Sequence, residues 1–127
     1  MRLKTFNFKE VAAQNADGDK AKIRWLINEA NGAENFSMRL IEIAPGGSSA
    51  HHSHEWEHEV FVLEGKGYIK GEKSKETLGK GTVVLVPKDE VHQFKNDGTK
   101  PLKFLCMIPL KKPASGSYER GSLSKKE

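Results

Sequence analysis

Apolar and polar residues alternate along much of this chain, which is the pattern expected of strands that bury one face. Residues 3–8 show it first, and within residues 21–28 the side chains of Ile23, Trp25 and Ile27 share one face. Further strands are predicted over residues 36–43, 58–63, 68–70, 82–86 and 102–108. Every segment that this pattern identifies is predicted to be a strand.

The connections between these segments are rich in Gly, Asn, Asp and Pro, the residues that favour turns. Residues 15–19 and 31–35 are predicted turns. Pro45, followed by two glycines, is expected to end the strand before it, because proline cannot donate a hydrogen bond to a neighbouring strand. Residues 71–81 are polar and charged and are expected to form a solvated hairpin end.

The chain has 127 residues, a length that suits one domain. Its formal net charge is +4, and residues 111–127 contribute +3 of this through five Lys or Arg and two Glu. The remainder is nearly neutral, so no nucleic-acid partner is predicted. Residues 111–127 are too polar to bury a core and are predicted to be a basic tail outside the folded domain.

A single cysteine cannot form an internal disulfide, and the N-terminal residues do not resemble a signal peptide. No apolar run approaches the roughly 20 residues that would span a bilayer. We therefore predict a cytoplasmic protein in its reduced form, with no membrane partner.

Histidine is the residue type with the most informative distribution: four of the five lie within residues 51–58, and the fifth is His92. Side chains two residues apart in a strand point the same way, so His52 and His54 can share one metal ion. A turn over residues 55–57 would return the chain and bring His58 over the same ion. Neutral imidazoles suit Zn, Cu, Fe, Ni and, less typically, Mn. The pattern predicts one divalent transition metal.

The spacing in this stretch resembles the first motif of the cupin family, which runs Gly, five residues, His-x-His, three or four residues, Glu, six residues, Gly. The chain meets it with Gly46, His52, His54 and Gly65. His58 stands where cupins usually carry glutamate, and it keeps six residues before the final glycine. Glu59 fits the looser spacing of four. We prefer His58 as the third ligand, with Glu59 as the alternative.

A second segment resembles the second cupin motif, which runs Gly, five residues, Pro-x-Gly, two residues, His, three residues, Asn. The chain supplies Gly81, Pro87, His92 and Asn96, and Asp89 replaces the inner glycine. Aspartate tolerates positive φ better than most residues, so the turn should survive this change. The two motifs occur in the family's order and span roughly residues 35–110.

The chain looks most similar to small single-domain cupins that hold manganese with four histidines. This resemblance implies an all-β fold, the cupin double-stranded β-helix or jelly-roll barrel, over residues 1–110. It implies one metal inside the barrel, held by His52, His54, His58 and His92. Manganese is the expected ion, with Fe, Ni, Cu or Zn as alternatives. A homodimer that exchanges its N-terminal strand is also expected.

Three further residues are candidates for lining the substrate pocket. Arg39 shares a face with two isoleucines, and if that face lines the barrel its guanidinium could bind a carboxylate or enolate. The alternative is a surface residue or a structural ion pair. Phe104 and Cys106 share the apolar face of the last strand, although a lone cysteine in such a strand is usually inert packing. Trp56, in the turn, is expected to be exposed.

Three functions with a small-molecule partner are compatible with these residues. The first is oxidative chemistry on a small enolic or unsaturated molecule, which the resemblance to cupin dioxygenases implies. The second is isomerisation or decarboxylation of a small acid or sugar without redox chemistry. The third is binding or sensing of a small ligand without turnover.

Overall fold

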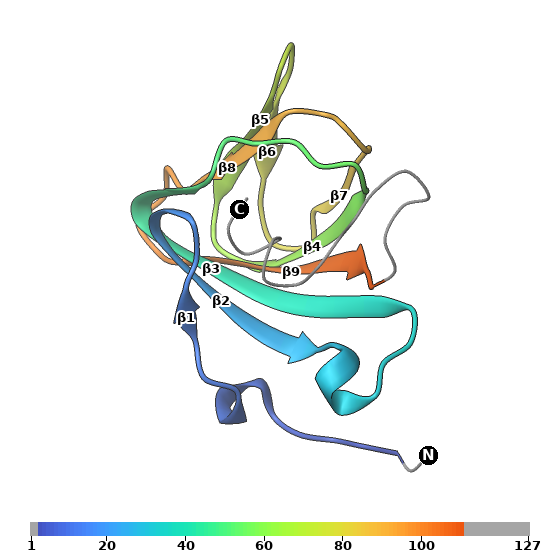
Figure 1. The fold of residues 1–127 in the computed structure, drawn as a ribbon. Helices are drawn as coiled ribbons and strands as arrows, with labels where there is room; N and C mark the ends of the chain where they lie inside the picture. Colours follow the sequence, from blue (N-terminus) through green and yellow to red (C-terminus); the bar gives the residue numbers. More distant parts are fainter. Residues whose placement is uncertain (1–2, 111–127) are drawn as a thin grey trace.

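The computed structural model describes residues 3–110, which form one curled antiparallel sheet and two short 3-10 helices (Figure 1). The all-β jelly-roll fold predicted from the sequence is confirmed. The predicted boundary of the domain at residue 110 stays a prediction, because the tail 111–127 lies outside the described residues. The elements in chain order are η1 (Phe8–Glu10), β1 (Gln14–Asn15), β2 (Gly18–Ile27), η2 (Glu29–Asn31), β3 (Phe36–Ser49), β4 (His58–Glu64), β5 (Gly67–Gly71), β6 (Lys75–Leu78), β7 (Val83–Val86), β8 (His92–Lys95) and β9 (Leu102–Pro109).

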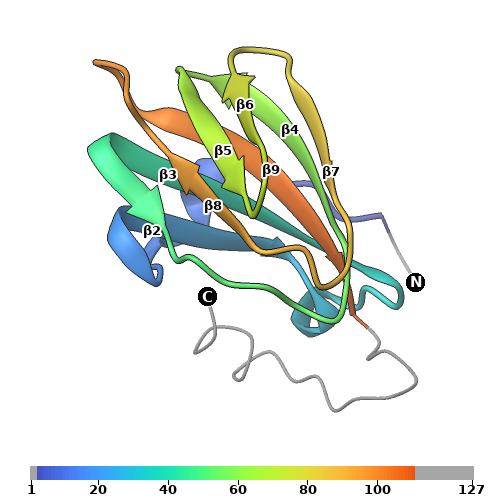
Figure 2. The same cartoon turned by 90° about the horizontal axis from the view of Figure 1, so that it is seen from above.

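Strand β3 is the central strand of the sheet and pairs with three others. It pairs with β2 along one edge and with β9 along the other, and its far end pairs with β8 where Ser48 meets Lys95. Figure 2 shows β2, β3 and β9 running side by side, with β8 beside the end of β3. This end of β3 leads directly into the histidine stretch, so the pairing with β8 brings the two predicted motifs together.

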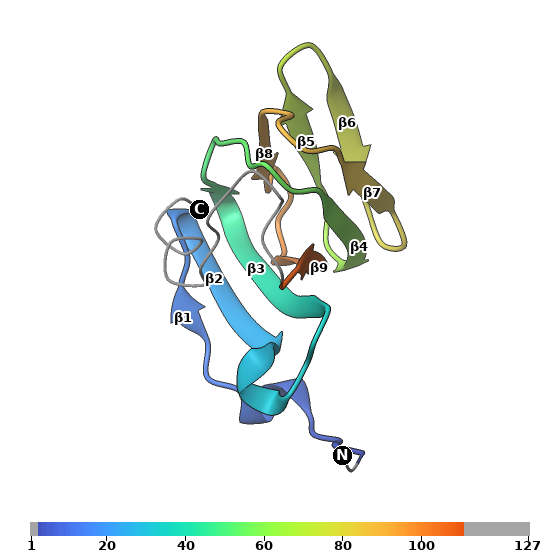
Figure 3. The same ribbon diagram turned by 45° about the vertical axis from the view of Figure 1, so that its right-hand side comes forward.

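The sheet curls so that its two outermost strands, β6 and β7, approach each other (Figure 3). Residues from β5, β6 and β7 line a common groove, among them Ile69, Glu76 and Val84. The concave face buries the core. In β9 the predicted alternation is confirmed, because its buried residues are Leu102, Phe104, Cys106 and Ile108.

The outer face of the curled sheet is partly apolar. In β4 and β7 the paired residues Phe61 and Val83 are both exposed, and Leu85 is exposed beside them. The inward residues of β4 are His58, Val60 and Val62. No helix in the described part of the chain has the length and apolar character needed to cross a bilayer.

Two irregularities in the pairing of β2 with β3 correct the predicted strands. A bulge between Trp25 and Ile27 shifts the register, so that Leu26 is buried and Ile27 is 37% exposed. The expected shared face of residues 23, 25 and 27 therefore fails at its last member. A second irregularity lies opposite Lys20, and β3 passes through Pro45 there instead of ending. The proline fits because the ladder register skips from residue 43 to residue 48.

The predicted strand over residues 3–8 is wrong. Residues 3–7 have no regular structure, and η1 follows with Asn7 as its N-cap, whose side chain accepts a hydrogen bond from the Lys9 amide at 2.9 Å. Arg24 holds this segment through hydrogen bonds to the carbonyls of Phe8 and Val11. No strand among residues 3–110 pairs with residues 3–8, so their alternation has no sheet to support it. Exchange of this segment in a dimer stays a prediction.

Candidate metal centre

A backbone bridge joins the two histidine motifs. The amide of His52 donates to the His92 carbonyl at 3.2 Å, and the amide of His92 donates to the His52 carbonyl at 2.9 Å. This two-way pairing fixes both residues at the same level of the barrel. His52 and His92 are about 40 residues apart in the chain. The bridge therefore brings imidazoles from two separate segments together.

Three imidazoles form a cluster with the dimensions of a metal site. One ring nitrogen from each of His52, His54 and His92 lies within 4.8 Å of the other two. His54 and His92 are buried, and His52 is half-buried. The ring centroids are 4.2 Å apart for His52 and His54, 4.7 Å for His52 and His92, and 5.8 Å for His54 and His92. Converging neutral nitrogens of this kind suit a divalent transition metal.

His58 lies beside this cluster without being part of the three-residue group. Its ring centroid is 5.0 Å from that of His54 and 5.1 Å from that of His92, both shorter than the separation between those two rings. Its Nε2 atom is buried and has no hydrogen-bond partner among the described residues. Its Nδ1 atom is 3.1 Å from the Cys106 sulfur and 3.3 Å from Nη2 of Arg39. Nε2 is therefore the nitrogen with capacity for a metal.

His92 is oriented by the backbone. Its Nδ1 atom is 2.9 Å from the carbonyl oxygen of Glu90, and a carbonyl can only accept a hydrogen bond. Nδ1 therefore carries the proton, which leaves the lone pair of Nε2 free to ligate. A histidine ligand that donates its second N–H to an oxygen in this way is the usual arrangement at protein metal sites.

Burial keeps these imidazoles neutral. Desolvation holds the pKa of His58 well below its usual value, and the positive charge of Arg39 lowers this pKa further. Burial also lowers the pKa of His92, and the hydrogen bond to Glu90 opposes part of that shift. A neutral imidazole is the form that binds a metal, so both side chains are ready to ligate at neutral pH.

The turn between His54 and β4 corrects one prediction. Trp56 is buried, with 8% of its surface exposed, whereas its turn position predicted exposure. Its ring stacks on His54, with centroids 4.6 Å apart and planes only 7° from parallel. The aromatic face covers one face of the imidazole and restricts its rotation. Trp56 is therefore part of the site's wall.

Two turns hold the cluster from outside. The amide of Asp89 donates to the His54 carbonyl, and Asp89 has φ 66°, as its position in the second motif predicts. Asn96, the last residue of that motif, is buried, and its side chain bonds backbone groups of three other residues. The motif asparagine therefore supports the fold of the site.

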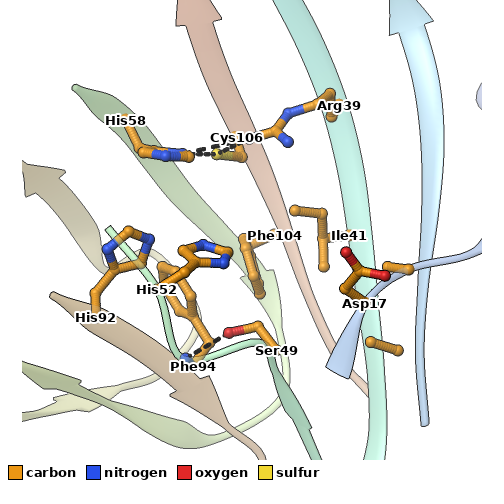
Figure 4. A pocket seen from close by; sticks show the side chains of 12 residues that line it. Asp17, Arg39, Ile41, Ser49, His52, His58, His92, Phe94, Phe104 and Cys106 are labelled. Atoms are coloured by element: carbon orange, nitrogen blue, oxygen red, sulfur yellow. Dashed lines mark hydrogen bonds between the residues drawn. The ribbon is translucent and has the colours of Figure 1, made fainter. Parts of the chain in front are cut away.

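A small cavity adjoins the histidines, with a volume of about 30 Å³. Figure 4 shows His52, His58 and His92 on one side of it, and Asp17 and Ile41 on the other. The predicted pocket residues Arg39, Phe104 and Cys106 all line it. This volume holds one or two water molecules and is too small for an organic substrate.

Some lining residues were not predicted from the sequence. Phe94 stacks on Phe104 with centroids 4.5 Å apart, and its place two residues after His92 on the same strand face could have identified it. Asp17, an exposed residue of the β1–β2 turn, has no comparable signal in the sequence. Among the described lining residues it is the one carboxylate.

The acidic residues near the first motif lie elsewhere. Glu59, the alternative third ligand, is exposed and lines a groove on the outer face of the sheet with Phe36 and Met107. Its neighbour His58 is only 4% exposed, because alternate residues of β4 point to opposite faces. Glu55 and Glu57 are also exposed.

Residues 39–108 match the profile of a family described as the cupin domain. A 1-methylthio-D-xylulose 5-phosphate methylsulfurylase from Rhodospirillum rubrum is 31% identical over 71 residues, which are 56% of this chain and 46% of that protein. The chain thus matches about half the length of this curated relative.

Two solved structures extend the likeness over most of the chain. The polyketide cyclase RemF from Streptomyces resistomycificus is 30% identical, with a TM-score of 0.80, and the match covers 88% of this chain and 82% of that one. A predicted oxalate decarboxylase from Thermotoga maritima is 22% identical, with a TM-score of 0.74 and coverage of 85% and 100%. The second likeness concerns the fold alone.

Proposed function

This chain belongs to the cupin family, and on that premise we propose that it is an enzyme that binds one divalent metal ion and activates a small enolisable molecule. The proposed ligands are His52, His54, His58 and His92. The substrate would carry oxygen atoms and approach from the mouth of the barrel. The family match over residues 39–108 supports the fold on which this proposal is built.

One observation carries the four-histidine assignment. The Nε2 atom of His58 is buried without a hydrogen-bond partner, beside rings that form a cluster with metal-site dimensions. Leaving a buried polar atom unsatisfied costs about 1–3 kcal/mol, so a fold that keeps one needs a compensating partner. A metal ion would supply that partner. The residues present therefore fit the group that the family implies.

The all-imidazole ligand set suits a substrate with anionic oxygens. Four neutral ligands leave a divalent ion with its full charge, whereas a glutamate ligand would neutralise part of it. When bound, such an ion supplies Lewis-acid polarisation of a substrate oxygen. Manganese is the proposed ion, on the resemblance to four-histidine manganese cupins.

The likeness to RemF favours enolate chemistry without oxidation. That relative is named a polyketide cyclase, and forming a carbon–carbon bond between carbonyl units begins with loss of a proton beside a carbonyl. Asp17 carries a carboxylate that can accept a proton. The lining imidazoles are instead engaged in the histidine cluster or in hydrogen bonds. We assign Asp17 that role. Phe94 and Phe104 would exclude water from the apolar wall of the site.

A second candidate is the oxidative reaction predicted from the sequence. The cavity of about 30 Å³, walled by Ile41, Phe94 and Phe104, has the size and apolar character that suit a diatomic gas such as dioxygen. Both candidates share the same ligands and the same enolisable substrate class. They differ in whether oxygen is consumed.

One experiment separates these candidates. The protein is loaded with Mn²⁺, Fe²⁺ or Zn²⁺, dialysed, and incubated with acetylacetone in deuterated buffer, with proton exchange followed by NMR and oxygen by an electrode. Metal-dependent exchange that Asp17→Asn slows, without oxygen uptake, supports enolate chemistry. Oxygen uptake with Mn²⁺ or Fe²⁺ supports the second candidate. Failure to retain any of the three ions would overturn both.

Four predicted properties complete the proposal: the extent of the domain, its compartment, its oligomeric state and the absence of two kinds of partner. The barrel comprises residues 1–110 and the tail comprises residues 111–127. The active unit is a cytoplasmic homodimer, and neither a nucleic acid nor a membrane is a partner. Sedimentation of the full chain and of a version ending at residue 110 would test the oligomeric state and the role of the tail together.

A further inference from the structure

We infer that Cys106 and Arg39 form a positioning pair that holds His58 in the tautomer whose Nε2 lone pair faces the histidine cluster. The inference rests on the proposed metal site and adds two residues to it. Neither residue would touch the metal or the substrate. Both would act through the ring of His58.

The register of three neighbouring strands brings these side chains together. Arg39 on β3 is paired directly with Cys106 on β9, and Cys106 is paired with Val60 on β4. His58 lies two residues before Val60 and therefore projects from the same face. Arg39 and Cys106 are 1% exposed and His58 is 4% exposed, so water does not compete for their hydrogen bonds. Figure 4 shows the three side chains meeting above the cavity.

The sulfur of Cys106 is the common acceptor in this group. Nη2 of Arg39 is 2.8 Å from the sulfur, and a guanidinium can only donate. Nδ1 of His58 is 3.1 Å from the same sulfur. The sulfur has two lone pairs, so it can accept from the guanidinium and from the imidazole together, and the guanidinium contact fixes its position. Nδ1 of His58 then carries its proton, and Nε2 does not.

Arg39 alone would favour the opposite tautomer. Its Nη2 atom is also 3.3 Å from Nδ1 of His58, so without the sulfur the guanidinium would donate to that nitrogen. The proton would then sit on Nε2 and block metal binding. The Cys106 sulfur therefore accepts the hydrogen bond of Arg39 in place of the ring. It also accepts a hydrogen bond from the Nδ1–H group of His58. His92 needs no such device, because the Glu90 carbonyl already accepts from its Nδ1.

The alternative is that Cys106 is an inert core residue between Phe104 and Ile108. A packing role depends on volume, whereas the positioning role depends on an acceptor at the sulfur position. Arg39 also lies over the Trp25 ring, with its guanidinium carbon 5.4 Å from the ring centroid, and this contact would hold the guanidinium in place in a Cys106 variant. The two roles thus predict different effects for variants that change the acceptor and for variants that change the volume.

The test measures the tautomer and metal affinity separately. Metal-free protein labelled with ¹⁵N-histidine is examined by NMR, which distinguishes protonated from unprotonated ring nitrogens, and the dissociation constant for Co²⁺ is measured by titration. In the natural chain His58 should be protonated on Nδ1. Cys106→Ala should move the proton to Nε2 and weaken Co²⁺ binding by about 10- to 100-fold, the range seen when outer ligand contacts are removed. The His92 signals should not change and serve as an internal control.

Two further variants make the result decisive. Cys106→Ser keeps an acceptor and should retain the Nδ1–H tautomer and most of the Co²⁺ affinity. Adding Arg39→Met to Cys106→Ala removes the competing donor and should restore part of the affinity that Cys106→Ala loses. The inference is overturned if Cys106→Ala keeps the tautomer, if Cys106→Ser loses as much affinity as Cys106→Ala, or if the double variant is weaker than either single one. A natural chain that binds no Co²⁺, Mn²⁺ or Zn²⁺ would instead overturn the proposed function, and the tautomer of its His58 would still decide the positioning role.

Discussion

Replacement of Asn96 by alanine should destabilise the barrel more than any single surface change. The Asn96 side chain is 3% exposed and bonds three backbone groups. Its amide nitrogen donates to the carbonyls of Ile43 and Lys100, each at 2.8 Å, and its oxygen accepts from the Gly98 amide at 2.8 Å. These bonds tie the turn after β8 to the middle of β3, and both strands position the histidines.

The size of the effect follows from the burial of these partners. A typical internal hydrogen bond contributes about 0.5–1.5 kcal/mol net, and a buried group left unsatisfied costs about 1–3 kcal/mol. The contact with Ile43 is buried, whereas the contacts with Lys100 and Gly98 are partly exposed, so water can replace those two. We therefore expect Asn96→Ala to lower the free energy of unfolding by about 2–4 kcal/mol.

Urea unfolding of the metal-free protein, followed by tryptophan fluorescence, measures this loss directly. The exposed Asn35 offers a matched control, and Asn35→Ala should stay within about 0.5 kcal/mol of the natural chain. Asn96→Asp has nearly the same volume but replaces the two N–H donors with an oxygen that faces two carbonyls. It should destabilise at least as much as Asn96→Ala at pH 7. The reasoning is refuted if Asn96→Ala is no worse than the control, or if Asn96→Asp is neutral.

Three further predictions concern the histidine cluster. The metal-free protein should lose stability as pH falls below about 6.5, because burial lowers the folded-state pKa of His58 and His92 and the unfolded chain then binds more protons. Urea titrations should give a slope of at most about 1.4 kcal/mol per pH unit for each group, and a flat profile would contradict it. His58→Ala should lose most bound Mn²⁺ on dialysis, measured by elemental analysis, while Glu59→Ala retains it; the reverse result would make Glu59 the ligand. Co²⁺ binding should quench the fluorescence of Trp56, which stacks on His54, and Trp56→Phe should remove most of this quenching.

The sequence predicted best where one short segment contains the whole signal. The spacing of the two motifs predicted that separated segments carry imidazoles to one place, and His52, His54 and His92 do cluster. The aspartate expected to take positive φ does so, because this preference is a property of the residue itself. Alternation in the last strand identified its buried face, because the whole pattern lies within that one strand. That His58 completes the ligand set stays a prediction.

Prediction failed where tertiary contacts decide. Residues 3–8 alternate like a strand, but pairing needs a neighbouring edge, and in the described chain Arg24 holds the following turn instead. Trp56 lies in a turn, which usually means exposure, yet the stack on His54 buries it. Ile27 loses its expected face to a bulge opposite Met38. None of these three outcomes has a signal within a few residues of the position concerned.

The arrangement around His58 shows why such contacts escape local patterns. Arg39 and Cys106 are 67 residues apart, and they meet only because β3 and β9 pair in one particular register. A slip of one residue between these strands would put the cysteine on the outer face and leave a buried guanidinium beside the imidazole, with no sulfur to accept from it. The hydrophobic alternation of β9 prevents that slip, because the slip would also expose Phe104 and Ile108. The apolar residues of this strand therefore fix both the core and the orientation of a candidate metal ligand, so a change that loosens the packing of β9 should weaken metal binding even when every histidine is intact.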